Sequence, residues 1–223
     1  MTAYDLVIFD CDGVLVDSEM LSAGVLMGMM AEEGFPITET EFRADFLGRS
    51  FANAASRVFV RYGHPLPDDF QMRYRERLLI RMRAALQPMA GVADVLRAMS
   101  VPYCLATSSS PQRLAVSLEV TGLAPFFSGR CFTASEVAHG KPAPDLPLHA
   151  ASRMKADAGR CLVIEDSEMG IRAAHAANMA CWQFAGGAHC RAGYDLPEDV
   201  VPDRVIMDMA ALRSAFRALA LCD

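Results

Sequence analysis

The chain has 223 residues, of which 52% are hydrophobic and 22% are charged, and its formal net charge is −6. This length suits one core with a smaller accessory unit, and the acidic balance argues against nucleic acid as a partner, because phosphate backbones require a basic surface. No segment approaches the roughly 18 unbroken apolar residues of a membrane span. The start carries no signal-peptide pattern, so we expect a cytoplasmic protein without a membrane partner.

The first expected element is a buried strand over residues 4–9, an apolar run that breaks at Asp10. Residues 16–89 then read as helix after helix, with turn signals between them and no convincing strand. Within this region, apolar residues at four-residue spacing give one helix a stripe that we assign to packing: Phe70, Tyr74, Leu78 and Met82. The sequence therefore predicts a helical cap domain at 16–89, inserted into a core of residues 1–15 and 90–223.

After the insert, strands alternate with helices. We expect strands at 103–106, 161–164, 181–184 and 203–206, and helices at 111–120, 168–177 and 207–221. This alternation predicts an α/β fold with a Rossmann-like parallel sheet. In such sheets ligands gather at the carboxyl ends of the strands, so the polar residues that follow the strands should meet there.

Four segments supply the polar and charged residues that are expected at that edge. They are Asp10-Cys11-Asp12-Gly13, the strand-ending Thr107, Lys141 within Gly140-Lys141-Pro142, and Glu165-Asp166. In this order they resemble the four motifs of the haloacid dehalogenase-like superfamily, and the resemblance covers nearly the whole chain. It implies a Rossmann-like core with a helical cap and an enzyme that acts through an aspartate nucleophile.

Phosphoryl transfer explains these residue types. A carboxylate such as Asp10 can form an acyl-phosphate, and Asp12, two residues on, suits a general acid and base. Two anions facing a phosphate need a cation, and oxygen ligands without His or Cys point to Mg²⁺. The resemblance implies that Asp10, the backbone carbonyl of Asp12 and Asp166 bind the metal. Glu165 is either a further ligand or an acid that orients the others.

Other residues are expected to bind the substrate. Thr107 offers a hydroxyl, the Ser108 N–H is expected where the next helix begins, and Lys141 adds positive charge to the phosphate and Asp10. Arg49, beside a glycine in the insert, is the candidate for a second anionic group of the substrate. The histidines show no ligand spacing and read as surface or packing residues: His64, His139, His149, His175 and His189.

The residues discriminate among the activities of this superfamily, and a binding module with a dead site is disfavoured because none of the four motifs has lost a residue. Asp12 and the acids at 165–166 argue against a dehalogenase, which needs neither, and the absence of lysine before Lys141 argues against a phosphonatase. The chain resembles beta-phosphoglucomutases through residues 136–145, but Ser22 stands where such mutases carry a cap histidine. We therefore favour a phosphatase for a small phosphorylated metabolite, similar to sugar-phosphate and 6-phosphogluconate phosphatases, and keep the mutase as the alternative.

Overall fold

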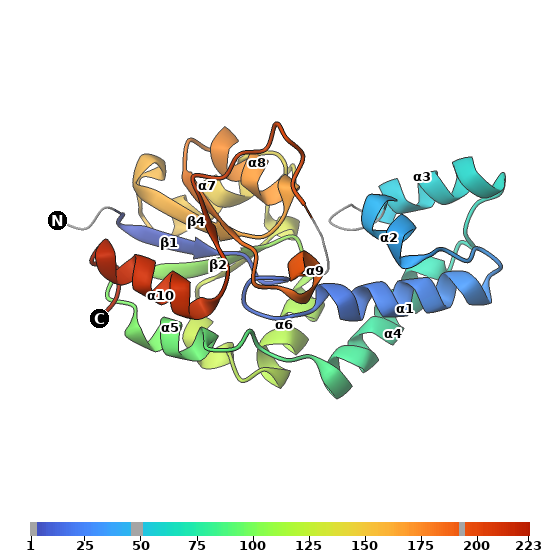
Figure 1. The fold of residues 1–223 in the computed structure, drawn as a ribbon, viewed down its shortest axis with the longest axis horizontal. Helices are drawn as coiled ribbons and strands as arrows, with labels where there is room; N and C mark the ends of the chain where they lie inside the picture. The colour runs from blue at the N-terminus through green and yellow to red at the C-terminus, as the bar shows by residue number, and fades with distance from the viewer. Residues whose placement is uncertain (1–3, 46–50, 192–194) are drawn as a thin grey trace.

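The computed structural model describes residues 4–45, 51–191 and 195–223. Its strands are β1 (Leu6–Phe9), β2 (Tyr103–Thr107), β3 (Cys131–Thr133), β4 (Cys161–Glu165), β5 (Ala180–Phe184) and β6 (Arg204–Ile206). They form one parallel sheet in the order β3-β2-β1-β4-β5-β6 (Figure 1). The predicted Rossmann-like α/β fold is confirmed.

The helices connect these strands and fill the space beyond one end of the sheet. They are α1 (Glu19–Glu32), α2 (Glu39–Asp45), α3 (Phe51–Tyr62), α4 (Phe70–Ala85), α5 (Val92–Ala98), α6 (Pro111–Val120), α7 (Asp145–Arg153), α8 (Glu168–Ala176), α9 (Ala188–Arg191) and α10 (Met209–Ala218). Short 3-10 turns occur at Ala124–Phe127, Ala134–Glu136 and Ala158–Arg160. In the described part of the chain, no helix has both the length and the apolar character that a bilayer crossing requires.

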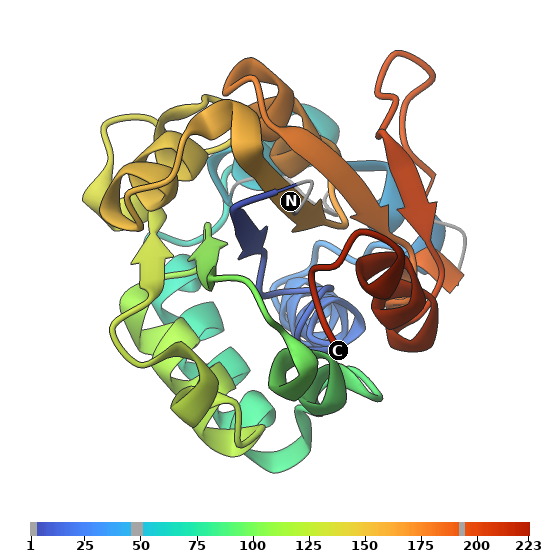
Figure 2. The same cartoon turned by 90° about the vertical axis from the view of Figure 1, so that its left-hand side faces the viewer.

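Both faces of the sheet are covered by helices, because successive side chains of a strand point to opposite faces. In β1, Val7 and Phe9 belong to a core that includes buried residues of α5, α6 and α10. Leu6 and Ile8 belong to a second core with residues of α7 and α8. Figure 2 shows helices on both sides of the sheet. All four β1 side chains are buried, which explains why this strand reads as an unbroken apolar run.

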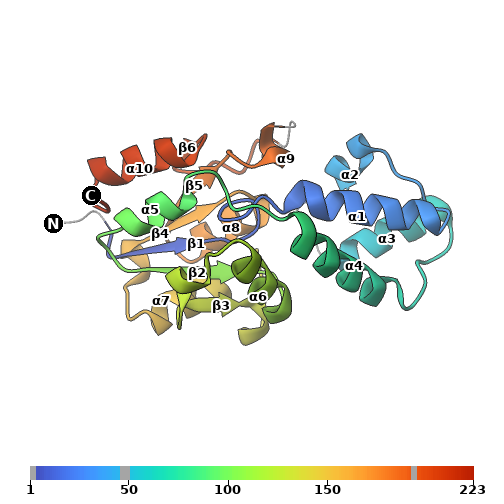
Figure 3. The ribbon, with the colours of Figure 1, turned by 90° about the horizontal axis from the view of Figure 1, so that it is seen from below.

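Helices α1 to α4 lie together beyond the carboxyl end of β1 (Figure 3). They enclose a cluster of their own, to which Phe70 contributes. Leu78 and Met82, further along α4, instead join the core that contains α5 and α6. The expected packing role of this stripe is confirmed, and α4 links the helical region to the rest of the molecule. The division into domains at residues 16 and 89 stays a prediction.

The strand order determines which polar residues lie close together at the carboxyl edge of the sheet. β1 lies between β2 and β4, with Phe9 in register with Leu105 on one side and Ile164 on the other. The chain therefore leaves β1 at a point where the connections on its two sides run in opposite directions, and ligand sites of parallel sheets form at such points. Residues that follow β1, β2 and β4 are brought to one place.

Candidate active site

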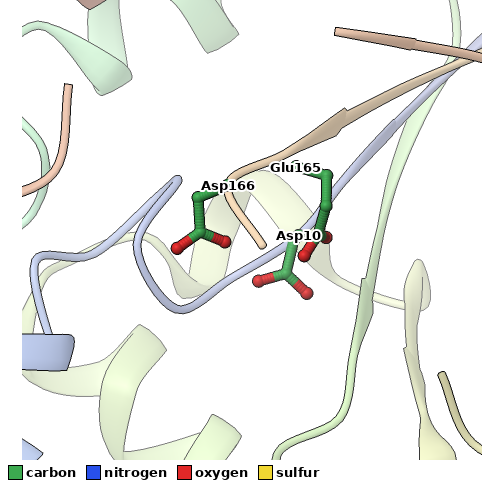
Figure 4. A group of neighbouring side chains, drawn as sticks. All are labelled: Asp10, Glu165 and Asp166. Atoms are coloured by element: carbon green, nitrogen blue, oxygen red, sulfur yellow. The ribbon is translucent and has the colours of Figure 1, made fainter. Parts of the chain in front are cut away.

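Three acidic residues meet at the carboxyl ends of β1 and β4. Asp10 follows β1, Glu165 ends β4 and Asp166 comes next, and one carboxylate oxygen of each lies within 4.8 Å of the others (Figure 4). All three are buried. Burial and mutual repulsion both disfavour ionised carboxylates, so such a group requires positive charge close by.

Lys141 supplies part of that charge. Its Nζ donates to Oδ1 of Asp10 at 2.6 Å and to Oε2 of Glu165 at 2.8 Å. Burial raises the pKa of Asp10 well above its usual value and Glu165 adds to this rise, while Lys141 opposes it. Burial would lower the pKa of Lys141, but Asp10 and Glu165 outweigh it and raise that pKa. The structure thus places Lys141 against Asp10, as the motif order predicted.

Asp12 has a different set of partners. Its Oδ1 accepts from Ser18 Oγ at 2.6 Å and from Arg113 Nη2 at 2.7 Å, and its Oδ2 accepts from Ser109 Oγ at 2.5 Å. Burial acts to raise the pKa of Asp12, but Arg113 and the two hydroxyl groups outweigh it and lower the pKa. The Asp12 side chain is therefore an ionised group held by Arg113, apart from the acidic group of Asp10.

Arg113 was not expected from the sequence. It lies in the first turn of α6, which begins at Pro111 after Ser110, and the Ser110 side chain accepts from the Arg113 N–H. This cap fixes the turn so that the guanidinium reaches Asp12 and, at 3.2 Å, the hydroxyl of Ser22 in α1. Ser22, the position at which the mutases carry histidine, thus lies beside the cation that holds Asp12.

The third pair joins Asp166 and His189. Nε2 of His189 lies 2.9 Å from Oδ2 of Asp166, and His189 is only 2% exposed. Burial would lower the pKa of this imidazole, but its contacts with Asp166 and Cys190 raise it to about 11. The interpretation of His189 as a surface or packing residue was wrong, because a buried imidazole against a carboxylate is an ion-pair partner. Its place after β5 is a weak signal, which becomes specific only when the strand order puts β5 beside β4.

The expected phosphate-binding residues lie in two environments. Thr107 is buried at the end of β2, and its Oγ1 accepts from the Ser109 N–H at 3.0 Å. Ser108 is exposed, and its N–H does not begin a helix, since α6 starts at Pro111 with Ser110 as its cap. The helix begins at the predicted Pro111 because proline favours the first helical position, and the role of the Ser108 N–H stays a prediction. Arg49 lies outside the described residues.

The comparison with known proteins settles the family. The model of the haloacid dehalogenase-like hydrolases matches residues 4–178, which contain every acidic residue of the site described above. The chain belongs to this hydrolase family. The resemblance read from the four motifs is confirmed, and so is the expectation that the protein is an enzyme.

Members of the haloacid dehalogenase-like family with known names or structures extend this result. The 6-phosphogluconate phosphatase of Escherichia coli is 25% identical over 85% of this chain and 86% of its own length. A probable pseudouridine-5'-phosphatase of Drosophila melanogaster is 34% identical over 77% of this chain and 78% of its own. The crystal structure of a family hydrolase from Deinococcus radiodurans, with bound phosphate and sodium, has a TM-score of 0.81 and 31% identity over 100% of this chain and 99% of that one.

The acidic group fits a hard divalent cation such as those this hydrolase family uses. Its donors are carboxylate oxygens alone, which is the ligand type that Mg²⁺ prefers. Gly13 has φ of +83°, and a Cβ there would fall on the Asp166 carboxylate, so glycine leaves the room that this carboxylate occupies. Both oxygens of Glu165 accept hydrogen bonds, from Lys141 and from Ser167, which favours an orienting role for this acid.

Proposed function

We propose that this hydrolase is a Mg²⁺-dependent phosphatase that cleaves a small sugar phosphate or sugar-acid phosphate through an aspartyl-phosphate on Asp10. The observation that carries the proposal is the buried Asp10 beside Lys141, within an acidic group at the end of β1. Two features of relatives support it. A curated relative over most of the chain is a 6-phosphogluconate phosphatase, and a structure with the same fold holds phosphate.

In the first step, a carboxylate oxygen of Asp10 attacks phosphorus as the bond from phosphorus to the ester oxygen breaks. The departing alkoxide takes a proton from Asp12 and leaves as an alcohol. Asp12 is ionised in the resting structure, where it accepts three hydrogen bonds, so it must take up a proton before this step. A phosphate monoester has a second pKa of about 6, so its monoanion can bring that proton into the site.

In the second step, Asp12 removes a proton from water, and the water oxygen attacks phosphorus of the acyl-phosphate. The bond from phosphorus to Asp10 breaks, which yields inorganic phosphate and restores the carboxylate. Thr107, the Ser108 N–H and Lys141 are proposed to bind the phosphate oxygens, on which negative charge accumulates in both transition states. Each of the three carries a proton that a hydrogen bond to phosphate can use.

The metal ligands in this proposal are Asp10, Asp166 and the backbone carbonyl of Asp12, with Glu165 as the orienting acid. When bound, Mg²⁺ supplies positive charge that offsets the repulsion between these carboxylates and the phosphate. Arg49 is proposed to read a second anionic group of the substrate. These roles are extensions of the motif resemblance to the residues present in this chain.

The test of the nucleophile compares Asp10→Asn with Asp94→Asn, a surface aspartate that pairs with Arg97. Phosphate release from 6-phosphogluconate and a panel of sugar phosphates would be measured with Mg²⁺ and with EDTA. We expect wild type and Asp94→Asn to release phosphate only with Mg²⁺. Because an amide cannot attack phosphorus, Asp10→Asn should be inactive, and turnover above roughly one hundredth of wild type would remove Asp10 from this role.

The mutase alternative is tested separately. Beta-glucose 1-phosphate with a trace of the bisphosphate and Mg²⁺ would be supplied, and glucose 6-phosphate and free phosphate would be followed in parallel. Ser22 has no imidazole with which to relay a proton to a sugar hydroxyl, so phosphate release should dominate. Glucose 6-phosphate formed faster than phosphate would show that the enzyme transfers the group to sugar and not to water.

A further inference from the structure

His189 forms a buried pair with Asp166, and the phosphatase chemistry above gives this histidine no role. We propose that His189 is a positioning residue for the metal site: its Nε2–H holds one oxygen of Asp166 and leaves the second oxygen to the cation. The inference rests on the proposed function, because it takes Asp166 to be a metal ligand. It adds a residue of the short helix α9, which follows β5 and lies outside the four motif segments.

The first support is the geometry of the pair. His189 Nε2 lies 2.9 Å from Asp166 Oδ2, and the exposed fractions of the two side chains are 2% and 6%. A hydrogen bond with both partners this well enclosed restricts rotation of the carboxylate. Asp166 is also the member of the acidic group that Lys141 does not contact, because Lys141 donates to Asp10 and Glu165.

The second support is the space that two glycines leave for the imidazole. A Cβ at Gly187 would lie 2.6 Å from Cε1 and 2.7 Å from Nδ1 of His189. A Cβ at Gly13 would lie 3.0 Å from the same Cε1 and would collide with the Asp166 carboxylate. The imidazole therefore lies between the backbone at Gly13 and the backbone at Gly187, and any residue larger than glycine at Gly187 would collide with it.

The third support is the attachment of α9 to the loop of the first motif. The N–H of Ala188 donates to Oδ1 of Asp17 at 3.0 Å, and Arg191 lies 3.8 Å from the other oxygen of Asp17. The guanidinium of Arg191 also donates to the carbonyl of Gly186, which closes the short turn around His189. The imidazole is thus carried by a segment whose position is fixed from two sides.

These contacts give the pair a defined role. A ligating carboxylate is commonly held by a hydrogen bond from outside the metal's own ligands, and loss of such a partner typically weakens metal binding about 10- to 100-fold. The Nε2–H donor exists in the neutral as well as the charged imidazole, so the positioning does not depend on one charge state. If His189 acted only through its charge, it would weaken Mg²⁺ binding, because a cationic imidazole repels the metal ion.

The experiment is a calorimetric titration of the substrate-free protein with Mg²⁺. His189→Met removes the donor at similar volume, His189→Gln retains an amide N–H near the place of Nε2, and Gly187→Ala displaces the ring without removing it. His175→Met is the matched control, since His175 is an exposed histidine whose Nε2 lies 3.6 Å from Asp203. Circular dichroism and thermal unfolding would establish that each variant is folded.

We expect the Mg²⁺ dissociation constant to rise about 10- to 100-fold in His189→Met and Gly187→Ala, to rise only a few-fold in His189→Gln, and to be unchanged in His175→Met. An unchanged or lower constant in folded His189→Met would overturn the inference while leaving the metal site intact. Asp166→Asn tests separately whether Asp166 binds the metal at all. If this variant binds Mg²⁺ as wild type does, the metal assignment fails and the role of His189 fails with it.

Discussion

Replacement of Lys141 by methionine should destabilise the folded protein in a pH-dependent way. The change removes the cation that lies 2.6 Å from Asp10 and 2.8 Å from Glu165, in a site where the lysine side chain is 9% exposed. Removing one partner of a buried ion pair costs about 3–5 kcal/mol, because the other charge stays buried without compensation. For a chain of this size each kcal/mol corresponds to about 2–4 °C in melting temperature, so we expect a decrease of roughly 6–20 °C.

The pH dependence follows from the carboxylates that remain. In wild type, the raised pKa of Lys141 keeps the amine charged at all pH values below its unfolded value, so its contribution is fully present in the assay range. Burial already raises the pKa values of Asp10 and Glu165, and Lys141 opposes this rise. Without the lysine, both pKa values should therefore rise further. The folded variant then binds more protons than the unfolded chain, and its stability falls as the pH increases.

Thermal and urea unfolding of metal-free protein at about pH 5, 6.5 and 8 would measure this effect. The deficit of Lys141→Met against wild type should be largest at the highest pH. Lys155→Met is the matched control, since Lys155 is the only other lysine of the chain and is exposed. A deficit below roughly 1 kcal/mol at every pH, or one that shrinks as the pH rises, would refute the account of Lys141 as the counter-ion of two buried carboxylates.

Two further predictions concern the surroundings of the acids. In Arg113→Met, Asp12 loses the cation that helps lower its pKa, so the limb of the pH–kcat profile that reports Asp12 should move to higher pH; an unmoved profile from steady-state rates would contradict this. Gly170→Ala should lower the free energy of unfolding by about 1–3 kcal/mol, because its Cβ would collide with the Glu165 carboxyl group. Gly28→Ala, in open space on α1, should raise it by roughly 0.5–1 kcal/mol, and urea unfolding that ranks the two alanine variants the other way would reject the reading of these glycines.

The sheet could be predicted from the sequence because its strands are buried on both faces. Runs such as residues 103–106 and 161–164 are apolar throughout, and each breaks at a polar residue. The structure extends these two strands by one residue, to Thr107 and Glu165, whose backbone still pairs although their side chains are polar. β3 was not predicted, since Cys131–Thr133 is too short to show a period.

The acids of the site could be predicted, but two of their counter-ions could not. Asp10, Asp12 and Glu165 follow or end strands, and their place in the chain is a local signal. Arg113 is 101 residues from Asp12, and nothing in its own neighbourhood distinguishes it from a solvated arginine of a helix. His189 likewise contacts Asp166 only because β5 lies beside β4. Such contacts depend on strand order and on the direction of one helix turn, which composition and spacing do not encode.

The strand order also has a consequence for synthesis of the protein. β1 pairs with β4, so Leu6 cannot pair until Cys161 has been synthesised. Lys141 is likewise 131 residues from its partner Asp10. At about 5–20 residues per second, a ribosome needs roughly 8–30 s between these two strands, and during that time the backbone N–H and C=O groups of β1 on the β4 side have no strand to pair with. Contacts this distant in sequence also form slowly once the chain is released. Newly made chains should therefore expose β1 to chaperones before any metal or phosphate can bind.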